Sequence, residues 1–291
     1  LNLFSDSFIT IILHAVPFLL IGALLSGIIE VFFSREDLSH WLPHNVLGKV
    51  LVGGLLGIFF PVCNAGAIPL ARRLMRKGFP AAVGITFILA APTLNPIAIF
   101  STLSVFGNGP IFWGRLGVTW IVAILVGLVF SFQDDPHKLV TVTTPIMEAV
   151  SIQKNLVDEE WREKIFRVLT VTADDFFDIG KLIALGAGLA AICQVLIPQT
   201  AIIIFDKGPV VSVLSMIVLA FIKSIGSAQN ASVGQFFTAI SGSGSLVAFL
   251  VSGSFVDLKG ILTFTRLFRP KTVIYIFLIS LLITVLLSVL M

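Results

Sequence analysis

The sequence predicts an all-α polytopic membrane protein, with about eight transmembrane helices in two tandem repeats that each contain a broken or re-entrant helix. The composition is 57% hydrophobic and only 12% charged, whereas soluble domains carry roughly 25% charged residues. Several apolar runs reach about 20 residues, the length that crosses a bilayer. Apolar segments also recur in a similar order in the two halves. These observations exclude an ordinary soluble protein.

The first repeat is expected to cover residues 1–132. Its apolar segments lie at 8–33, 46–60, 79–106 and 111–132. A basic turn between the second and third segments holds Arg72, Arg73, Arg76 and Lys77. The positive-inside bias places this turn in the cytoplasm, where it would touch anionic lipid headgroups. Arg115, near the start of the fourth segment, is expected to be an anchor at the end of a span.

Residues 133–170 are the one hydrophilic stretch and predict a cytoplasmic linker that ends in an amphipathic helix. The second repeat is expected to cover residues 171–291. Its apolar segments lie at 179–197, 209–222, 246–264 and 273–290. Eight full crossings put both termini in the cytoplasm. If the broken segments are re-entrant, the number of crossings in each half becomes odd and an inverted repeat is possible. The orientation of the halves therefore stays open.

Two alignments between the halves support a duplication. Residues 17–33 align with 181–197 and pair Gly22 with Gly186. Further along, AAPTLN (90–95) aligns with SGSFVD (252–257) and pairs Asn95 with Asp257. The register shifts by two residues between these points, as one small gap would produce. Internal repeats of this kind are typical of secondary transporters, which bind solute at the interface between repeats.

Residues 60–102 contain five prolines in an apolar context and cannot form one regular helix. Pro92 deprives the Ile88 carbonyl of its helical donor, and Pro96 does the same to the carbonyl of Pro92. Asn95-Pro96 then predicts a helix restart, with Asn as N-cap and Pro at the first helical position. Broken backbone is tolerated in a membrane only where protein or a water-filled cavity satisfies it. The stretch therefore predicts a binding site.

The strings PVCNAGAIPLARRLMRKGFP and FILAAPTLNPIAIFSTL, with AFLVSGSFVDLKGIL in the second half, resemble a bacterial family of predicted permeases. That family includes an organoarsenical efflux permease, and the likeness covers nearly the whole chain. The resemblance implies an eight-span permease of the inner (plasma) membrane.

This chain departs from the family in its cysteines. The family motif often reads Cys-Ser-Cys-Gly, whereas this chain has Cys63, Asn64, Ala65 and Gly66. The matching second-half stretch, residues 226–230, has no cysteine. Soft metalloids prefer thiolates. The departure therefore puts arsenical transport in doubt and favours an oxygen-rich or anionic substrate bound by amides and helix ends.

The candidate substrate-binding residues are polar or ionisable side chains in the two broken regions: Cys63, Asn64, Thr93, Asn95, Lys223, Gln229, Asn230 and Asp257. Each has a structural alternative, because a proline pair can mark a simple kink, a polar side chain can join helices and a lysine can snorkel. Asp257 is the candidate for proton or cation coupling, with Lys259 as its partner. His14 and Cys193 are expected in the core.

The leading function is a secondary transporter, by resemblance an efflux permease, that binds a small molecule or ion between the two broken helices. A channel that uses the same helices as a selectivity element is the alternative. A membrane-embedded enzyme or thiol-redox carrier is a third class. No nucleotide-binding motif occurs, and no cofactor, resident metal or nucleic acid is expected. The bilayer is the expected partner, and a homo-oligomer stays open.

Overall fold

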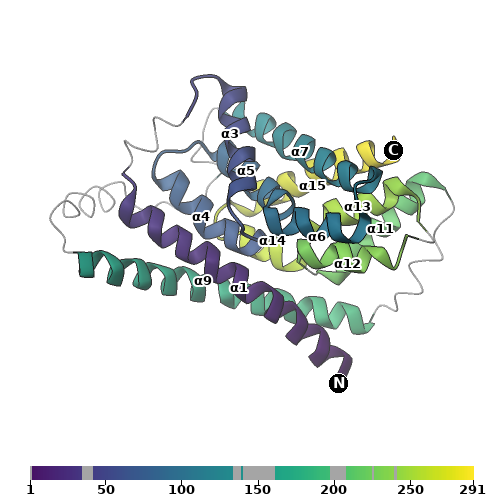
Figure 1. The fold of residues 1–291 in the computed structure, drawn as a ribbon, viewed down its shortest axis with the longest axis horizontal. Coiled ribbons are helices and arrows are strands. Elements are labelled where there is room, and N and C mark those ends of the chain that lie inside the picture. Colours follow the sequence, from purple (N-terminus) through teal and green to yellow (C-terminus); the bar gives the residue numbers. More distant parts are fainter. Residues whose placement is uncertain are drawn as a thin grey trace.

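The computed structural model describes residues 2–34, 42–133, 139, 161–196, 208–224, 226–238 and 241–291. Within these ranges the elements are all α-helices (Figure 1). The first half contains α1 (Asn2–Phe32), α3 (Val46–Phe59), α4 (Asn64–Arg76), α5 (Ala81–Leu94), α6 (Pro96–Phe106) and α7 (Pro110–Ser131). The second half contains α9 (Trp161–Leu196), α11 (Pro209–Lys223), α12 (Ser227–Gln235), α13 (Ser243–Phe255), α14 (Leu258–Phe264) and α15 (Pro270–Val289).

Four of these helices begin with proline at the first helical position: α6, α7, α11 and α15. Proline is suited to that position because its missing N–H would have no intrahelical partner there. Gly107, which ends α6, has φ of 63°, and Gly208, which precedes α11, has φ of 137°. Glycine adopts these conformations without a steric penalty. The chain thus turns sharply at the ends of its apolar segments.

Among the described residues, five helical segments are long and apolar enough to cross a membrane, with α5 and α6 counted together as one, and a sixth candidate is the bent pair α13–α14. The helices α3 and α11 are apolar but shorter. The structure therefore supports a multi-helix membrane protein with five or six spans by length, and the predicted count of about eight is not confirmed. The first-half break falls between α5 and α6, and the second-half break falls between α13 and α14.

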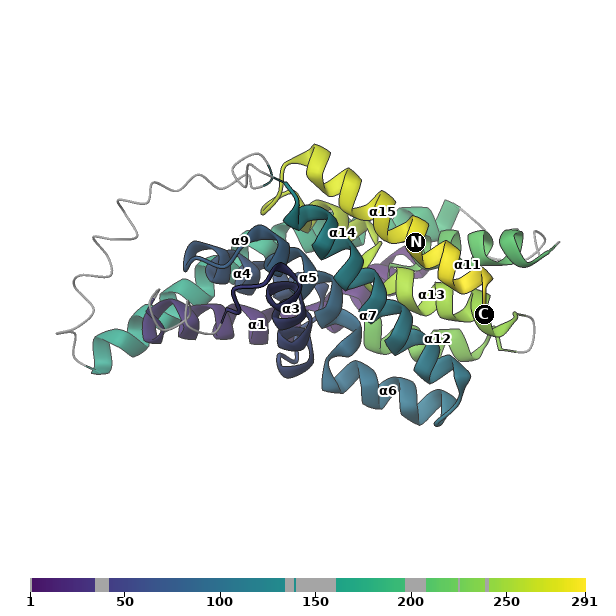
Figure 2. The same cartoon turned by 90° about the horizontal axis from the view of Figure 1, so that it is seen from above.

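The first segments of the two broken helices, α5 and α13, lie at the centre of the molecule. All 14 residues of α5 are buried, and so are the residues of α13 from Gly244 to Phe255. In contrast, α1 and α9 pack side by side along one edge and project beyond the other helices (Figures 1 and 2). The 36-residue α9 joins part of the predicted amphipathic segment to the predicted fifth span. Most of the predicted linker lies outside the described residues.

Helices from the two halves pack against one another around this centre. In the first half α5 packs on α3 and α7, and in the second half α13 packs on α11 and α15. Across the halves, α6 contacts α12 and α4 contacts α14. Helices α1 and α4 cross closely, since a Cβ added to Gly22 would overlap the Gly66 backbone. Glycine at both positions allows this approach. Each half thus contributes short helices that reach into the other.

Candidate functional site

Asn95 holds the first helix break together. Its Oδ1 accepts a hydrogen bond from the Ala98 N–H at 2.9 Å and caps α6. Its Nδ2 donates to the carbonyls of Ala91 at 2.7 Å, Pro92 at 3.1 Å and Val62 at 3.3 Å. The sequence predicted the restart at Asn95-Pro96 and a carbonyl at Pro92 without its helical donor. The structure confirms the restart and shows that the same asparagine satisfies that carbonyl.

Asp257 caps the restart in the second half and also carries a buried charge. Its Oδ1 accepts from the Gly260 N–H at 2.7 Å, and its Oδ2 lies 3.1 Å from Lys259 Nζ. Lys259 also donates to the Ser224 carbonyl. Both ionic side chains are almost fully buried. Because burying ions is costly unless they are paired, the carboxylate and the ammonium must stabilise each other.

Asn64 links the two breaks across the chain. It is the first residue of α4, and its Nδ2 donates to Asp257 Oδ1 at 3.4 Å. Its Oδ1 is buried and has no hydrogen-bond partner among the described residues. Asn64 is 4% exposed, so bulk solvent does not reach that oxygen. A buried acceptor without a partner is costly, which points to a ligand or a bound water.

These side chains surround one cavity of about 20 Å³, which is room for about one water molecule. The cavity lies where α1 meets the first residues of α4, α6, α12 and α14. Its polar lining consists of His14, Cys63, Asn64, Asn95, Gln229, Ser254, Asp257 and Lys259. The structure thus brings together five of the eight predicted site residues: Cys63, Asn64, Asn95, Gln229 and Asp257.

His14 from α1 and Gln229 from α12 line the cavity and make an exposed contact with each other, so we call this pair the mouth. Gln229 Nε2 lies 3.2 Å from His14 Nδ1, and the contact is exposed. The prediction that His14 belongs to the core is wrong, because its side chain lies at the surface and lines the cavity. The mouth therefore pairs one residue from each half of the chain.

Three predicted site residues lie outside the cavity lining. Thr93 is fully buried in α5, and its hydroxyl has no partner among the described residues. Asn230 is fully buried between α12 and α13, close to Gly253. Lys223 ends α11, and its carbonyl accepts from Gln194 Nε2 at 2.9 Å. In this conformation none of the three residues lines the cavity.

Three polar residues that line the cavity were not among the candidates from the sequence: His14, Ser254 and Lys259. Lys259 had a visible signal, since it lies two residues from Asp257 in an apolar segment. Ser254 had none, because a serine inside an apolar helix usually bonds to its own backbone, and Ser254 does donate to the Leu250 carbonyl.

Arg115 corrects a second expectation. It is not an anchor at the end of a span, because it is completely buried. Its guanidinium donates to the Thr102 hydroxyl of α6 at 2.5 Å and to the Ser254 hydroxyl of α13 at 3.3 Å. Arg115 therefore joins the two broken-helix elements immediately behind the cavity wall.

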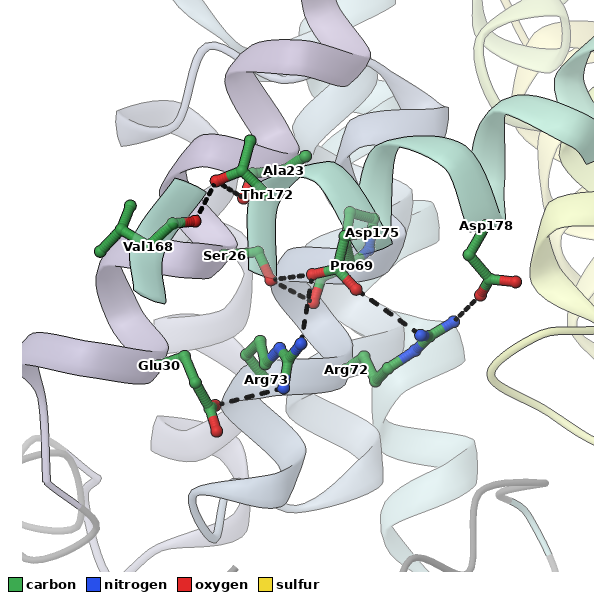
Figure 3. A network of polar contacts seen from close by, with 10 residues as sticks. All are labelled: Ala23, Ser26, Glu30, Pro69, Arg72, Arg73, Val168, Thr172, Asp175 and Asp178. Carbon is green, nitrogen blue, oxygen red and sulfur yellow. Dashed lines mark hydrogen bonds and ion pairs between the residues drawn. The ribbon is translucent and has the colours of Figure 1, made fainter. Parts of the chain in front are cut away.

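The basic end of α4 forms an ion-pair cluster with α1 and α9 (Figure 3). Arg72 lies 3.2 Å from Asp178 and 3.7 Å from Asp175. Arg73 lies 3.5 Å from Asp175 and 3.5 Å from Glu30. Both arginine side chains are nearly buried, at 12% and 11% exposed. The prediction that these arginines contact lipid headgroups is therefore wrong.

Ser26 and Lys77 extend the cluster into α1. Ser26 donates to Asp175 at 2.7 Å, and Lys77 Nζ donates to the carbonyls of Glu30 and Phe33. Arg266, just after α14, lies 3.0 Å from Asp178. The cluster thus fastens α4 to the two long outer helices, at the opposite end of α4 from Asn64.

The described residues contain no group of three or more His, Cys, Asp or Glu side chains that could hold a metal ion. Both cysteines are free thiols. Cys63 lines the cavity, whereas Cys193 packs against the Met216 and Phe249 cluster.

Comparison with known proteins agrees with this membrane architecture. The family model described as "Predicted permease" matches residues 1–291. UPF0718 protein YcgR of Bacillus subtilis (strain 168) is 36% identical over 270 residues, which cover 92% of this chain and 90% of that protein. A Streptococcus mutans protein (strain ATCC 700610 / UA159), named as a subunit of a two-component membrane permease complex, is 34% identical over 268 residues. Those residues cover 92% of this chain and 87% of that protein. No solved structure matches the chain. The chain belongs to the family of predicted permeases.

Proposed function

We propose that this permease is a secondary transporter, working as an exporter, that binds a small solute in the cavity between its two broken helices. The observation that carries the proposal is that Asn95 and Asp257, the N-caps of the two restarts, line one cavity. Discontinuous helices that meet between repeats are the usual binding-site architecture of secondary transporters.

Helices α1 and α9 run antiparallel, because Ser7 bonds to Gln194 near one end and Phe32 packs on Trp161 at the other. An odd number of crossings therefore precedes α9, and the proposed topology is an inverted repeat, residues 1–132 and 171–291. The five long helices and the bent pair are its crossings, and α3 and α11 are short helices that do not cross. The order of elements supports the repeat, since each half has a long helix, a short apolar helix, a short helix, a broken helix and a final span. We place the protein in the inner membrane.

Alternating access follows from the contacts between halves. Since α6 packs on α12 and α4 packs on α14, a rocking motion of one half would move both sides of the cavity. The contact between His14 and Gln229 would separate in that motion and open the mouth. In the conformation described, the cavity is nearly closed.

Asp257 is the proposed coupling residue. A proton or cation that binds its carboxylate competes with Lys259, which lies 3.1 Å away. Loss of that ion pair would free Lys259 and weaken the link to Asn64. Ion binding and solute binding would then share the same side chains.

A channel that uses the same broken helices is the second candidate. The short polar lining between helix ends would serve as its selectivity element. Recording from a planar bilayer separates the two functions, because a transporter gives no unitary currents. A thiol relay has less support, since Cys63 and Cys193 lie in different packing environments.

Thiol modification at Cys63 tests the site, with Cys193 as the matched control. Proteoliposomes are assayed for transport of trivalent organoarsenicals, small oxyanions and divalent cations, before and after a bulky methanethiosulfonate reagent. The Cys193→Ser variant should stay sensitive to the reagent, and Cys63→Ser should be resistant. Transport that continues after mass spectrometry shows complete labelling of Cys63 would refute the cavity as the binding site.

A further inference from the structure

We propose that the solute is a small oxyanion that retains an O–H group, a proposal that rests on the transporter function above. The class covers hydrogen carbonate and dihydrogen phosphate, which both accept and donate hydrogen bonds. Three features of the cavity support this class of solute: the helix N-termini that meet there, the unsatisfied oxygen of Asn64 and the charged groups at the wall.

Two helices begin at the cavity without a capping side chain. The N-cap residues of α4 and α12, Cys63 and Gly226, both line it. Neither forms a side-chain cap hydrogen bond, in contrast to Asn95 and Asp257. A thiol is a weak acceptor and glycine has no side chain. The N-terminal ends of α4 and α12, with the positive ends of their dipoles, therefore lie at the cavity, which favours an anion.

Asn64 lines the cavity between these ends. Its Oδ1 is buried and has no partner in the described part of the chain. A fully deprotonated anion such as nitrate offers only acceptors and would leave this oxygen unsatisfied. An oxyanion with an O–H group donates to Oδ1 while its remaining oxygens accept from the helix ends. Asn64 thus selects for the protonated oxyanion.

The charged groups at the cavity wall leave room for one negative charge. Asp257 and Lys259 neutralise each other at 3.1 Å, so the carboxylate does not by itself repel an anion. Lys259 has one N–H donor besides the two used by Asp257 and the Ser224 carbonyl. Arg115 brings a guanidinium within one hydrogen bond of the lining residue Ser254. The electrostatic surroundings are consistent with one negative charge in the cavity.

The described side chains argue against metal ions and soft metalloids as solutes. No group of three metal-binding side chains is present in the described ranges. Cys63 is the one thiol at the cavity, and a soft metalloid prefers several thiolates. The cavity of about 20 Å³ also favours the smallest oxyanions and requires some widening at the His14–Gln229 mouth.

Hydrogen carbonate and nitrate are the matched probes, because both are planar, singly charged and similar in size, and only hydrogen carbonate has an O–H group. Thermal stabilisation of the purified full chain is measured with each anion at equal ionic strength near pH 8. Tetramethylammonium and a trivalent organoarsenical provide the cationic and neutral comparisons. Hydrogen carbonate should bind about tenfold more tightly than nitrate, as expected for one hydrogen bond to a charged ligand.

Two variants test whether the anions bind at this cavity. Asn64→Leu removes the acceptor and should abolish the preference for hydrogen carbonate. Gln229→Glu adds a negative charge to the first turn of α12 at a half-exposed position and should weaken binding of both anions. Because Gln229 lies at the mouth, the second variant remains informative if Asn64→Leu fails to fold. The melting temperature without ligand monitors folding of both.

Each outcome decides between the proposals. Equal binding of the two anions, or a preference that survives Asn64→Leu, overturns the O–H requirement. Stabilisation by tetramethylammonium or the arsenical without any response to anions overturns the substrate class and leaves the transporter function standing. No stabilisation by any solute, together with transport that is insensitive to Cys63 modification, overturns the transporter site itself.

Discussion

Asn95 and Asp257 make the same hydrogen bond in two different helix breaks. Asn95 Oδ1 accepts from Ala98 N at 2.9 Å, and Asp257 Oδ1 accepts from Gly260 N at 2.7 Å, in each case three residues along the chain. The remaining atoms differ in use. The Asn95 amide donates to three backbone carbonyls, whereas the second Asp257 oxygen pairs with Lys259. In the first break, the Asn95 side chain is fully used by backbone groups. In the second break, the Asp257 side chain places a charge at the cavity.

Replacing Asn95 should destabilise the fold more than loss of a cap alone. We expect Asn95→Ala to lower the free energy of unfolding in detergent by about 3 kcal/mol. About 1 kcal/mol comes from the cap and the remainder from buried carbonyls left without a donor. The control is Asn95→Asp, which keeps the cap oxygen and removes the donor. Equal stability of Asn95→Ala and wild type in a denaturant titration would contradict this role.

Removing the Asp257 charge should leave Lys259 unpaired in the interior. Asp257→Asn keeps a cap oxygen, so the expected loss of about 3 kcal/mol comes from the isolated ammonium. The double variant Asp257→Asn with Lys259→Met should recover part of that stability. A double-mutant cycle measures the coupling between the two side chains. Strictly additive losses would show that the ion pair contributes nothing.

Replacing Thr93 should not destabilise the protein, in contrast to the two variants above. Its buried hydroxyl has no partner among the described residues, so Thr93→Val replaces an unsatisfied polar atom by a methyl group. Stability should be unchanged or higher by up to about 1 kcal/mol. Transport should also be unchanged, because Thr93 does not line the cavity. If transport falls while stability is maintained, Thr93 contacts the solute in another conformation.

Asp175 and Asp174 are adjacent and differ in environment. Asp175 is buried between Ser26, Arg72 and Arg73, whereas Asp174 is exposed. Asp175→Asn should cost about 3 kcal/mol, because it leaves buried arginines without their shared carboxylate. Asp174→Asn should change stability by less than about 0.5 kcal/mol. Unfolding titrations of the two variants in parallel provide the comparison, and similar losses would argue that the cluster is not stabilising.

Gly66 should tolerate no side chain. An added Cβ would lie 2.5 Å from the Phe18 carbonyl oxygen of α1, and backbone atoms cannot give way cheaply. Gly66→Ala should therefore separate α1 from α4 and lower the melting temperature. Gly117→Ala on α7 is the matched control, since nothing lies within 4 Å of its added Cβ. A melting temperature for Gly66→Ala equal to that of Gly117→Ala would contradict the close crossing.

Features set by neighbouring residues could be predicted from the sequence. Asn95-Pro96 combines a capping side chain with a ring that suits the first helical position, so the restart of α6 follows from two adjacent residues. Asp257 could be assigned the same role by alignment of the halves. The apolar segments also predicted most helices, because hydrophobic length is a local property.

Partners distant in the sequence could not be predicted. Arg72 looked like a lipid-facing cation, yet its partner Asp178 lies 106 residues away. His14 and Gln229 meet across 215 residues. Arg115 has a polar partner 139 residues away in Ser254, which is why its position near a span end was misleading. Whether a charge faces lipid or protein depends on such packing, and a single sequence does not show it.

Helix α4 has the cavity at one end and the ion-pair cluster at the other. Asn64 lies in its first turn, and Arg72 and Arg73 lie about 12 Å further along its axis. A displacement at Asn64 would be passed along this 13-residue helix to the two arginines. Under the proposed function, solute binding and the geometry of the distant ion pairs would then be coupled, each influencing the other by the same free energy. The occupant of the central cavity would thereby affect how firmly the two longest helices are fastened.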